Sequence, residues 1–81
     1  MDVARDPRWG RVEGTFGEDA YLTSQMGLAA VKGFQGDMSK GLSDSNVLVT
    51  LKHFVAHGQP ESGTNGGPVN VSDRVLREVF M

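Results

Sequence analysis

The chain has 81 residues, a formal net charge of −2 at pH 7 and no cysteine. Its eight basic residues are scattered along the sequence, so we predict no nucleic-acid partner. No apolar run is long enough to cross a bilayer, and Met1 is followed by Asp2 and Arg5 rather than by a signal peptide, so no membrane partner is expected. Without cysteine, the sequence does not assign a redox compartment or a localisation.

The first 17 residues are predicted to form a strand end and a loop. Pro7 cannot donate to a sheet ladder, and it forces Asp6 into an extended or turn conformation. Arginines on such a loop can bind a carboxylate or neighbouring sugar hydroxyls, because a guanidinium offers five donors in a fixed fork. An internal ion pair is therefore one hypothesis for the charged residues of this loop, and Arg8 is the candidate favoured for it. The charged residues concerned are Arg5, Asp6, Arg8, Arg11 and Glu13.

A helix is predicted from Asp19, as N-cap, to about Gly33. Its apolar residues recur at helical spacing and are expected to pack on the strands of a sheet. These residues are Leu22, Met26, Ala29 and Ala30. The following segment, residues 37–46, is polar and predicts a loop.

The run from Val47 to Leu51 is typical of a short buried strand of a parallel sheet. A second helix is predicted after Ser72 as N-cap, with Val75, Leu76, Val79 and Phe80 on one face. Residues 58–71 between them form a long loop rich in Gly, Pro, Asn and Ser. Long loops at the carboxyl end of a strand are often functional.

Lys52 and His53 follow the predicted strand directly. Polar groups at that position face the ligand crevice in α/β proteins. The alternative is a solvated lysine beside a hydrogen-bonded structural histidine. His57 lies four residues after His53, but Phe54 stands where a zinc protease has its glutamate, so no metal site is predicted. Trp9 and two phenylalanines, Phe16 and Phe54, are assigned to packing.

Four segments carry a pattern that decides between these alternatives. They are Asp6-Pro7-Arg8-Trp9-Gly10-Arg11, Thr15-Phe16-Gly17-Glu18-Asp19, Lys52-His53-Phe54 and Gly58-Gln59-Pro60-Glu61-Ser62-Gly63-Thr64-Asn65. In their order and spacing they resemble glycoside hydrolase family 3, of the β-glucosidase and β-xylosidase type, within its N-terminal (β/α)8 barrel. The resemblance covers nearly the whole chain. It implies part of a retaining exo-acting β-glycosidase, with a β-glycoside or oligosaccharide as substrate and no cofactor.

By this resemblance, Arg11, Lys52 and His53 match the residues that bind the sugar in the −1 subsite. A glycosidase holds the ring through hydrogen bonds that strengthen toward an oxocarbenium-like transition state. Successive side chains on a regular strand point to opposite faces, however, so Lys52 and His53 can share a pocket only where the strand is irregular. We therefore expect a bulge, an early strand end or a non-proline cis peptide at this point in the intact enzyme.

A (β/α)8 barrel needs about 250 residues, so 81 residues supply roughly a third of one. The predicted fold class is α/β, a partial (β/α)8 TIM barrel of roughly two βα units, with residues 1–81 as an internal fragment of the barrel domain. The family's nucleophile, an aspartate in a Ser-Asp-Trp motif, has no counterpart here, because the sequences around Asp44 and Asp73 lack the tryptophan. The acid/base residue is missing as well. We expect no catalytic residue in this piece and no activity from it alone; the alternative is a non-catalytic carbohydrate-binding or interaction module.

Overall fold

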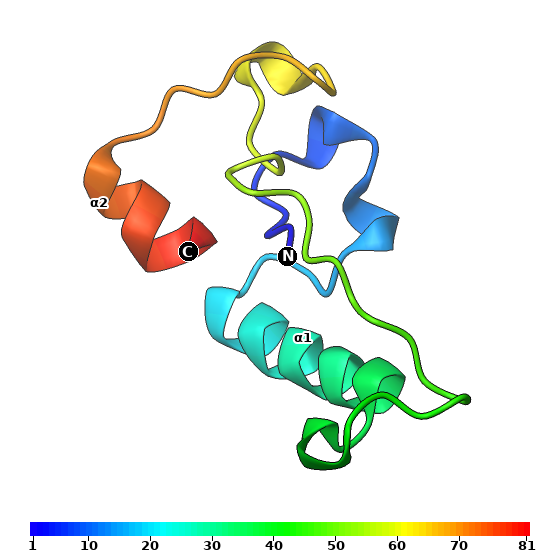
Figure 1. Ribbon diagram of the computed structural model, residues 1–81. Helices are drawn as coiled ribbons and strands as arrows, with labels where there is room; N and C mark the ends of the chain where they lie inside the picture. The colour runs from blue at the N-terminus through cyan, green and yellow to red at the C-terminus, as the bar shows by residue number, and fades with distance from the viewer.

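The computed structural model describes residues 1–81 and shows one long helix, one shorter C-terminal helix and several short helical turns joined by loops (Figure 1). The elements in chain order are η1 (Pro7–Trp9), η2 (Val12–Gly14), α1 (Ala20–Gln35), η3 (Met38–Lys40), η4 (Glu61–Gly63), α2 (Asp73–Val75) and η5 (Leu76–Phe80). The last two are continuous, because α2 passes directly into the π-helical turn η5.

The helix α1 begins where its cap predicts. The carboxylate of Asp19 accepts a hydrogen bond from the backbone N–H of Leu22 at 2.6 Å, which satisfies a free donor of the first turn. The helix ends at Gln35, two residues beyond the expected Gly33, and Gly36 follows with a φ of 68°. The N-cap prediction is thus confirmed, and the end was placed slightly too early.

The buried face of α1 differs from the predicted one. Thr23 and Gly27 are buried, whereas Leu22 and Met26 are exposed. Gly27 faces Met1 so closely that a Cβ on it would stand 3.1 Å from Met1 Cγ. The predicted packing stripe is wrong for this structure, because the strands that it was expected to cover are not formed.

No β-strand occurs anywhere in the chain, so the predicted strand from Val47 to Leu51 is wrong and the α/β arrangement with two βα units is not observed. The segment runs beside the end of α1 instead: Val47 N–H donates to the carbonyl of Phe34 at 3.0 Å and Val49 N–H to Gln35 Oε1 at 3.0 Å. A strand needs a neighbouring strand for its ladder hydrogen bonds, and this chain offers none.

The C-terminal helix supplies four of the nine residues of the small core. Ser72 caps it by accepting from Val75 N–H at 3.3 Å, as predicted. Phe80 is buried against Val3 and Ala56. Further half-buried residues pack around this centre, namely Val55, Val69, Val71, Val75, Leu76 and Val79.

The chain start runs alongside Gly58. The carbonyl of Gly58 accepts hydrogen bonds from Arg5 N–H at 3.0 Å and from Asp6 N–H at 3.1 Å. A Cβ at position 58 would lie 2.0 Å from the carbonyl oxygen of Val3, so only glycine allows this approach. The contact places the start of the chain beside the segment that contains Lys52 and His53.

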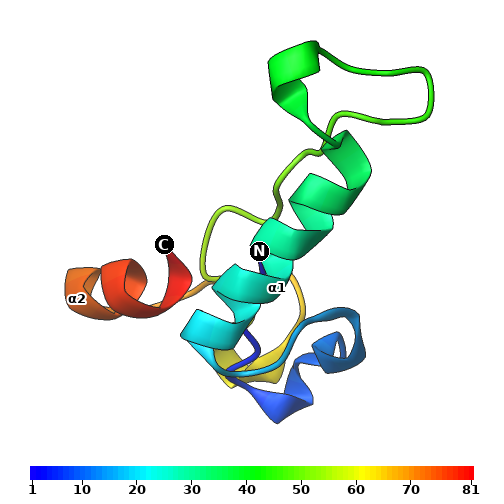
Figure 2. The same cartoon turned by 90° about the horizontal axis from the view of Figure 1, so that it is seen from below.

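The molecule is elongated. Its Cα radius of gyration is 14.5 Å, against about 12 Å for a compact domain of this length. In Figure 2 the far end of α1, together with η3 and the loop after it, extends away from the C-terminal helix. Only 10 of the 81 residues are buried, so the core is small for the length of the chain. No helix has both the length and the apolar character needed to cross a membrane.

Candidate functional site

His53 lies at the centre of a polar cluster that joins distant parts of the chain. Its backbone N–H donates to Asp2 Oδ1 at 3.1 Å, and its ring Nδ1 is hydrogen-bonded to Asp2 Oδ2 at 2.9 Å. The Asp2 side chain is 15% exposed and that of His53 is 37% exposed. The pair is therefore partly shielded from water.

His57 connects His53 to the first loop. The two imidazole rings are tilted by 52° with centroids 4.1 Å apart, and His57 meets the indole of Trp9 edge to face at 4.9 Å. Trp9 Nε1 in turn donates to Asn65 Oδ1 at 2.8 Å. The cluster thus draws together the chain start, the first loop, residues 52–57 and the long loop.

The backbone around His53 is irregular. The peptide bonds Lys52–His53 and Phe54–Val55 are cis, and Ala56 has a φ of 67°. No strand runs through Lys52 and His53 in this chain, and the irregularity expected there in the intact enzyme stays a prediction.

No ion pair joins the side chains of the three predicted sugar-binding residues to one another. His53 is half-buried in the cluster, while Lys52 and Arg11 are exposed. Arg11 lies between η1 and η2, as the residue that precedes Val12. The side chains of Arg11 and Lys52 form no ion pair, so they keep their donors free, and their convergence on one sugar stays a prediction.

The predicted structural role of Arg8 is confirmed. Its guanidinium donates to both carboxylate oxygens of Asp6, from Nε to Oδ1 at 3.1 Å and from Nη2 to Oδ2 at 2.8 Å. This side-chain hydrogen bonding, together with a hydrogen bond from the Arg8 backbone N–H, holds the pKa of Asp6 below its ordinary value. The same carboxylate raises the pKa of Arg8. The Arg8 side chain therefore has a structural role within the first loop, as the partner of Asp6.

The three aromatic residues that were predicted to pack differ in their burial. Trp9 is 2% exposed, which confirms its packing role. Phe16 is half-buried. Phe54 is 82% exposed, so its assignment to packing is wrong for this structure, since the chain folds nothing over that side chain.

Sequence reasoning missed Asp2 and Asn65 and gave His57 no role. Asp2 and Asn65 reach the site across 51 and 56 positions of sequence. No local spacing marks such long-range partners. The only indication in the sequence was His53 itself. A partly buried imidazole beside a site generally needs a hydrogen-bond acceptor to fix its orientation, so a partner for His53 could have been expected without being identified.

Asp2, His53 and His57 are the residues that could hold a cation, because one ligand atom from each lies within 4.8 Å of the others. In the observed arrangement, however, Nδ1 of His53 is engaged by the Asp2 carboxylate. A cation would have to displace the proton of that hydrogen bond. The geometry is that of a hydrogen-bonded histidine.

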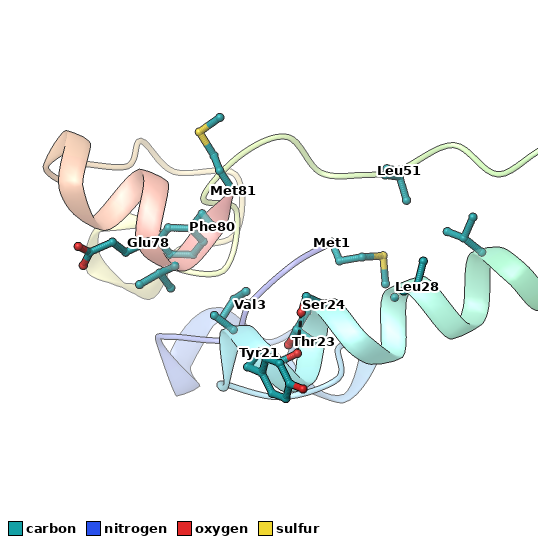
Figure 3. A pocket seen from close by; sticks show the side chains of 14 residues that line it. Met1, Val3, Tyr21, Thr23, Ser24, Leu28, Leu51, Glu78, Phe80 and Met81 are labelled. Carbon is teal, nitrogen blue, oxygen red and sulfur yellow. Dashed lines mark hydrogen bonds between the residues drawn. The ribbon is translucent and has the colours of Figure 1, made fainter.

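An apolar hollow of ≈ 630 Å³ lies elsewhere, between α1, the chain start and η5. Figure 3 shows Leu28 on α1 close to Met1, with Val3 and Phe80 near the start of the same helix. None of Arg11, Lys52 and His53 lines this hollow. Ten of its 14 lining residues are hydrophobic, and it lies apart from the polar cluster around His53, so it is not the candidate site.

Comparison with known proteins identifies the class. The sequence matches the glycosyl hydrolase family 3 N terminal domain over residues 1–81. It is 45% identical to a beta-xylosidase of Formosa agariphila and 45% identical to the periplasmic beta-glucosidase of Salmonella typhimurium, each over 82 aligned residues and the whole of this chain. These alignments cover 11% and 10% of the two relatives.

A solved structure agrees with this. The beta-glucosidase from Listeria innocua, in complex with isofagomine, superposes with a TM-score of 0.87 at 43% identity, over 99% of this chain and 11% of that one. The chain therefore belongs to glycosyl hydrolase family 3, as part of its N-terminal domain. It spans about a tenth of the length of the relatives that it matches.

Proposed function

We propose that this chain is part of a retaining exo-acting β-glycosidase that hydrolyses terminal β-D-glucosyl or β-D-xylosyl residues. In that enzyme it contributes Arg11, Lys52 and His53 as ligands of the −1 sugar. The observation that carries the proposal is the match of all 81 residues to family 3, with β-xylosidase and β-glucosidase relatives at 45% identity. The isofagomine complex of the Listeria innocua relative supports a sugar-like ligand.

The chemistry available in the chain fits holding a sugar better than cleaving one. Arg11 and Lys52 are exposed cations that form no ion pair, and His53 is an imidazole 37% exposed and held by Asp2. Retaining hydrolysis also needs two carboxylates about 5 Å apart across the scissile bond. Of the carboxylates near the candidate site, Asp2 is bound to His53 and Asp6 to Arg8. The nucleophile and the acid/base are assigned to parts of the enzyme outside these residues, because the Ser-Asp-Trp motif of the family has no counterpart in the chain.

A chimera tests the proposal. The segment of the Listeria innocua beta-glucosidase that matches this chain is replaced by residues 1–81, and the release of nitrophenol from β-glucosides and β-xylosides is measured. Loss of one hydrogen bond to a charged group costs about 1.5–3 kcal/mol, or about 10- to 100-fold in kcat/KM. Arg11→Ala, Lys52→Ala and His53→Ala should each show such a loss, with kcat reduced, because these bonds strengthen in the transition state.

Matched controls separate sugar binding from general effects. Arg77→Ala and Lys32→Ala remove exposed cations from η5 and α1 that form no ion pair, and both should leave the kinetics unchanged. Unchanged kinetics in all three site variants of an active chimera would contradict the proposal. Sugar binding by the isolated chain, with no effect of these residues on turnover, would favour a non-catalytic binding module.

A further inference from the structure

We propose that Asp2 is a positioning residue for His53: its carboxylate keeps the imidazole proton on Nδ1 and leaves Nε2 as a hydrogen-bond acceptor for a sugar hydroxyl. The part that concerns the sugar rests on the function proposed above. The part that concerns the proton rests only on the contacts between Asp2 and His53.

One carboxylate holds both the backbone and the ring of the same residue. Asp2 Oδ1 accepts from the N–H of His53 at 3.1 Å, and Oδ2 lies 2.9 Å from Nδ1. Two anchors on one residue fix the position of the backbone and the rotation of the side chain together. Because Asp2 is 15% exposed, water competes with these hydrogen bonds less than at an open surface.

The acceptor character of the carboxylate places the proton. An ionised carboxylate can only accept hydrogen bonds, so the ring nitrogen that faces Oδ2 must carry the hydrogen. In a neutral imidazole the other nitrogen is then an acceptor without hydrogen. The His53 side chain is 37% exposed and makes no second hydrogen bond within the chain, so Nε2 has no partner there.

A second residue, His57, contacts the face of the His53 ring. His57 lies against His53 with ring centroids 4.1 Å apart, and its far side meets Trp9, which is fastened to Asn65. Asp2 therefore sets which nitrogen points outward, while His57 limits tilting of the ring.

This assignment makes the site asymmetric in its hydrogen bonding. Arg11 and Lys52 can only donate, because guanidinium and ammonium groups have no acceptor. His53 with a free Nε2 can only accept. A sugar hydroxyl can donate to Nε2 and accept from Lys52 at the same time, whereas an ether oxygen at that position could not donate. The site is thereby suited to a ring that carries a free hydroxyl there.

The first test measures the tautomer directly. Long-range ¹H–¹⁵N NMR spectra of the 81-residue chain are recorded at about pH 8.5, where an ordinary imidazole is neutral. We expect His53 to carry its hydrogen on Nδ1. In the carboxylate the backbone N–H faces Oδ1 and Nδ1 faces Oδ2. Asp2→Asn replaces one of these oxygens with an NH₂ group that only donates, and donation to a bare Nδ1 while the remaining oxygen keeps the backbone N–H should make the Nδ1–H form lose its place as the major species.

The control is Asp44→Asn, which changes an exposed aspartate that makes no ion pair. It should leave the His53 tautomer unchanged, and the Trp9 indole N–H resonance reports that each variant keeps the fold. A folded wild-type chain with Nε2–H as the major form would overturn the proposal. So would an Nδ1–H population that is the same in Asp2→Asn.

The second test does not require the isolated chain to be stable. In the chimera, Asp2→Asn, His53→Ala and the double variant form a double-mutant cycle in kcat/KM. Asp2→Asn should lower kcat/KM about tenfold, and the double variant should be no worse than His53→Ala, because Asp2 acts through the imidazole. Losses that multiply would show a merely structural role and overturn the proposal. If His53→Ala leaves the kinetics unchanged, the proposed function fails, while the NMR result decides the proton assignment separately.

Discussion

Trp9 and Asn65 are joined by a hydrogen bond from Nε1 to Oδ1 at 2.8 Å, across 56 positions of sequence. The bond fastens the long loop to the first loop, where η4 also lies against η1. Within the long loop, Glu61 N–H donates to the carbonyl of Pro68 at 2.8 Å and closes it on itself. Asn65 thus gives the buried indole its acceptor and gives the loop a fixed place.

The first prediction concerns this bond. Asn65→Ala removes the acceptor of a buried indole N–H, which costs about 1–3 kcal/mol of unfolding free energy. The emission of Trp9, the single tryptophan, should shift to longer wavelength as the loop loosens and water reaches the indole. Fluorescence-monitored urea unfolding measures both effects. Asn70→Ala, an exposed change in the same loop without a side-chain hydrogen bond, is the control; an equal effect of both variants would contradict the role of Asn65.

A second prediction compares two glycines. Gly58→Ala would place a methyl group 2.0 Å from the carbonyl oxygen of Val3, so the chain start must move and both hydrogen bonds to the Gly58 carbonyl are weakened. Gly33 lies in α1 with nothing within 4 Å of its Cβ position. Gly33→Ala should therefore stabilise the fold by about 0.4–1 kcal/mol, while Gly58→Ala destabilises it. Urea unfolding of the two variants side by side decides this, and opposite signs are the expected result.

The features that could be predicted from the sequence are those in which cause and effect are close along the chain. Asp19 caps α1 through Leu22, three residues away, and Asp6 pairs with Arg8, two residues away. The strand from Val47 to Leu51 failed because its hydrophobic pattern describes an environment, a sheet buried on both faces, that these 81 residues do not provide.

The candidate site contains a long-range contact that the sequence could not predict. The family resemblance indicated His53, but the partner that orients it, Asp2, lies 51 positions away and has no pattern of its own. The contact exists because Gly58 lets the chain start pass close to the segment that contains His53. Such a contact depends on the path of two loops, which no local propensity describes.

A third prediction follows from the depressed pKa of Asp6. Its ionised form is favoured in the folded chain, so the Arg8–Asp6 pair contributes stability above the pKa of an unfolded aspartate, and this contribution is lost as the pH falls below about 4. NMR titration of Arg8→Ala should show the pKa of Asp6 rising toward its ordinary value. In contrast, Lys40→Ala should leave the depressed pKa of Asp37 unchanged, because hydrogen bonds from the Ser39 hydroxyl and backbone N–H cause that depression.

A fourth prediction is that the isolated chain is marginally stable and associates with further copies of itself. Few residues are buried, and apolar side chains such as Leu28 line an open hollow (Figure 3). Sedimentation should show an average mass that rises with concentration. Leu28→Asp, at a side chain 50% exposed in the hollow, should weaken association more than Leu42→Asp, at one 47% exposed outside it. A monomer with a sharp thermal transition independent of concentration would contradict this prediction.

The last prediction is that the 81-residue chain alone does not hydrolyse β-glycosides. Retaining cleavage needs a carboxylate nucleophile and a carboxylic acid on opposite sides of the glycosidic bond, whereas the carboxylates of Asp2 and Asp6 in the candidate site region are both occupied by basic partners. Incubation with nitrophenyl β-glucoside and β-xyloside should release no more nitrophenol than a blank, while the chimera under the same conditions turns both or one of them over. Turnover by the isolated chain that disappears when one of its own carboxylates is changed to an amide would show that the catalytic pair lies within these residues, and the division of labour proposed for the enzyme would then be wrong.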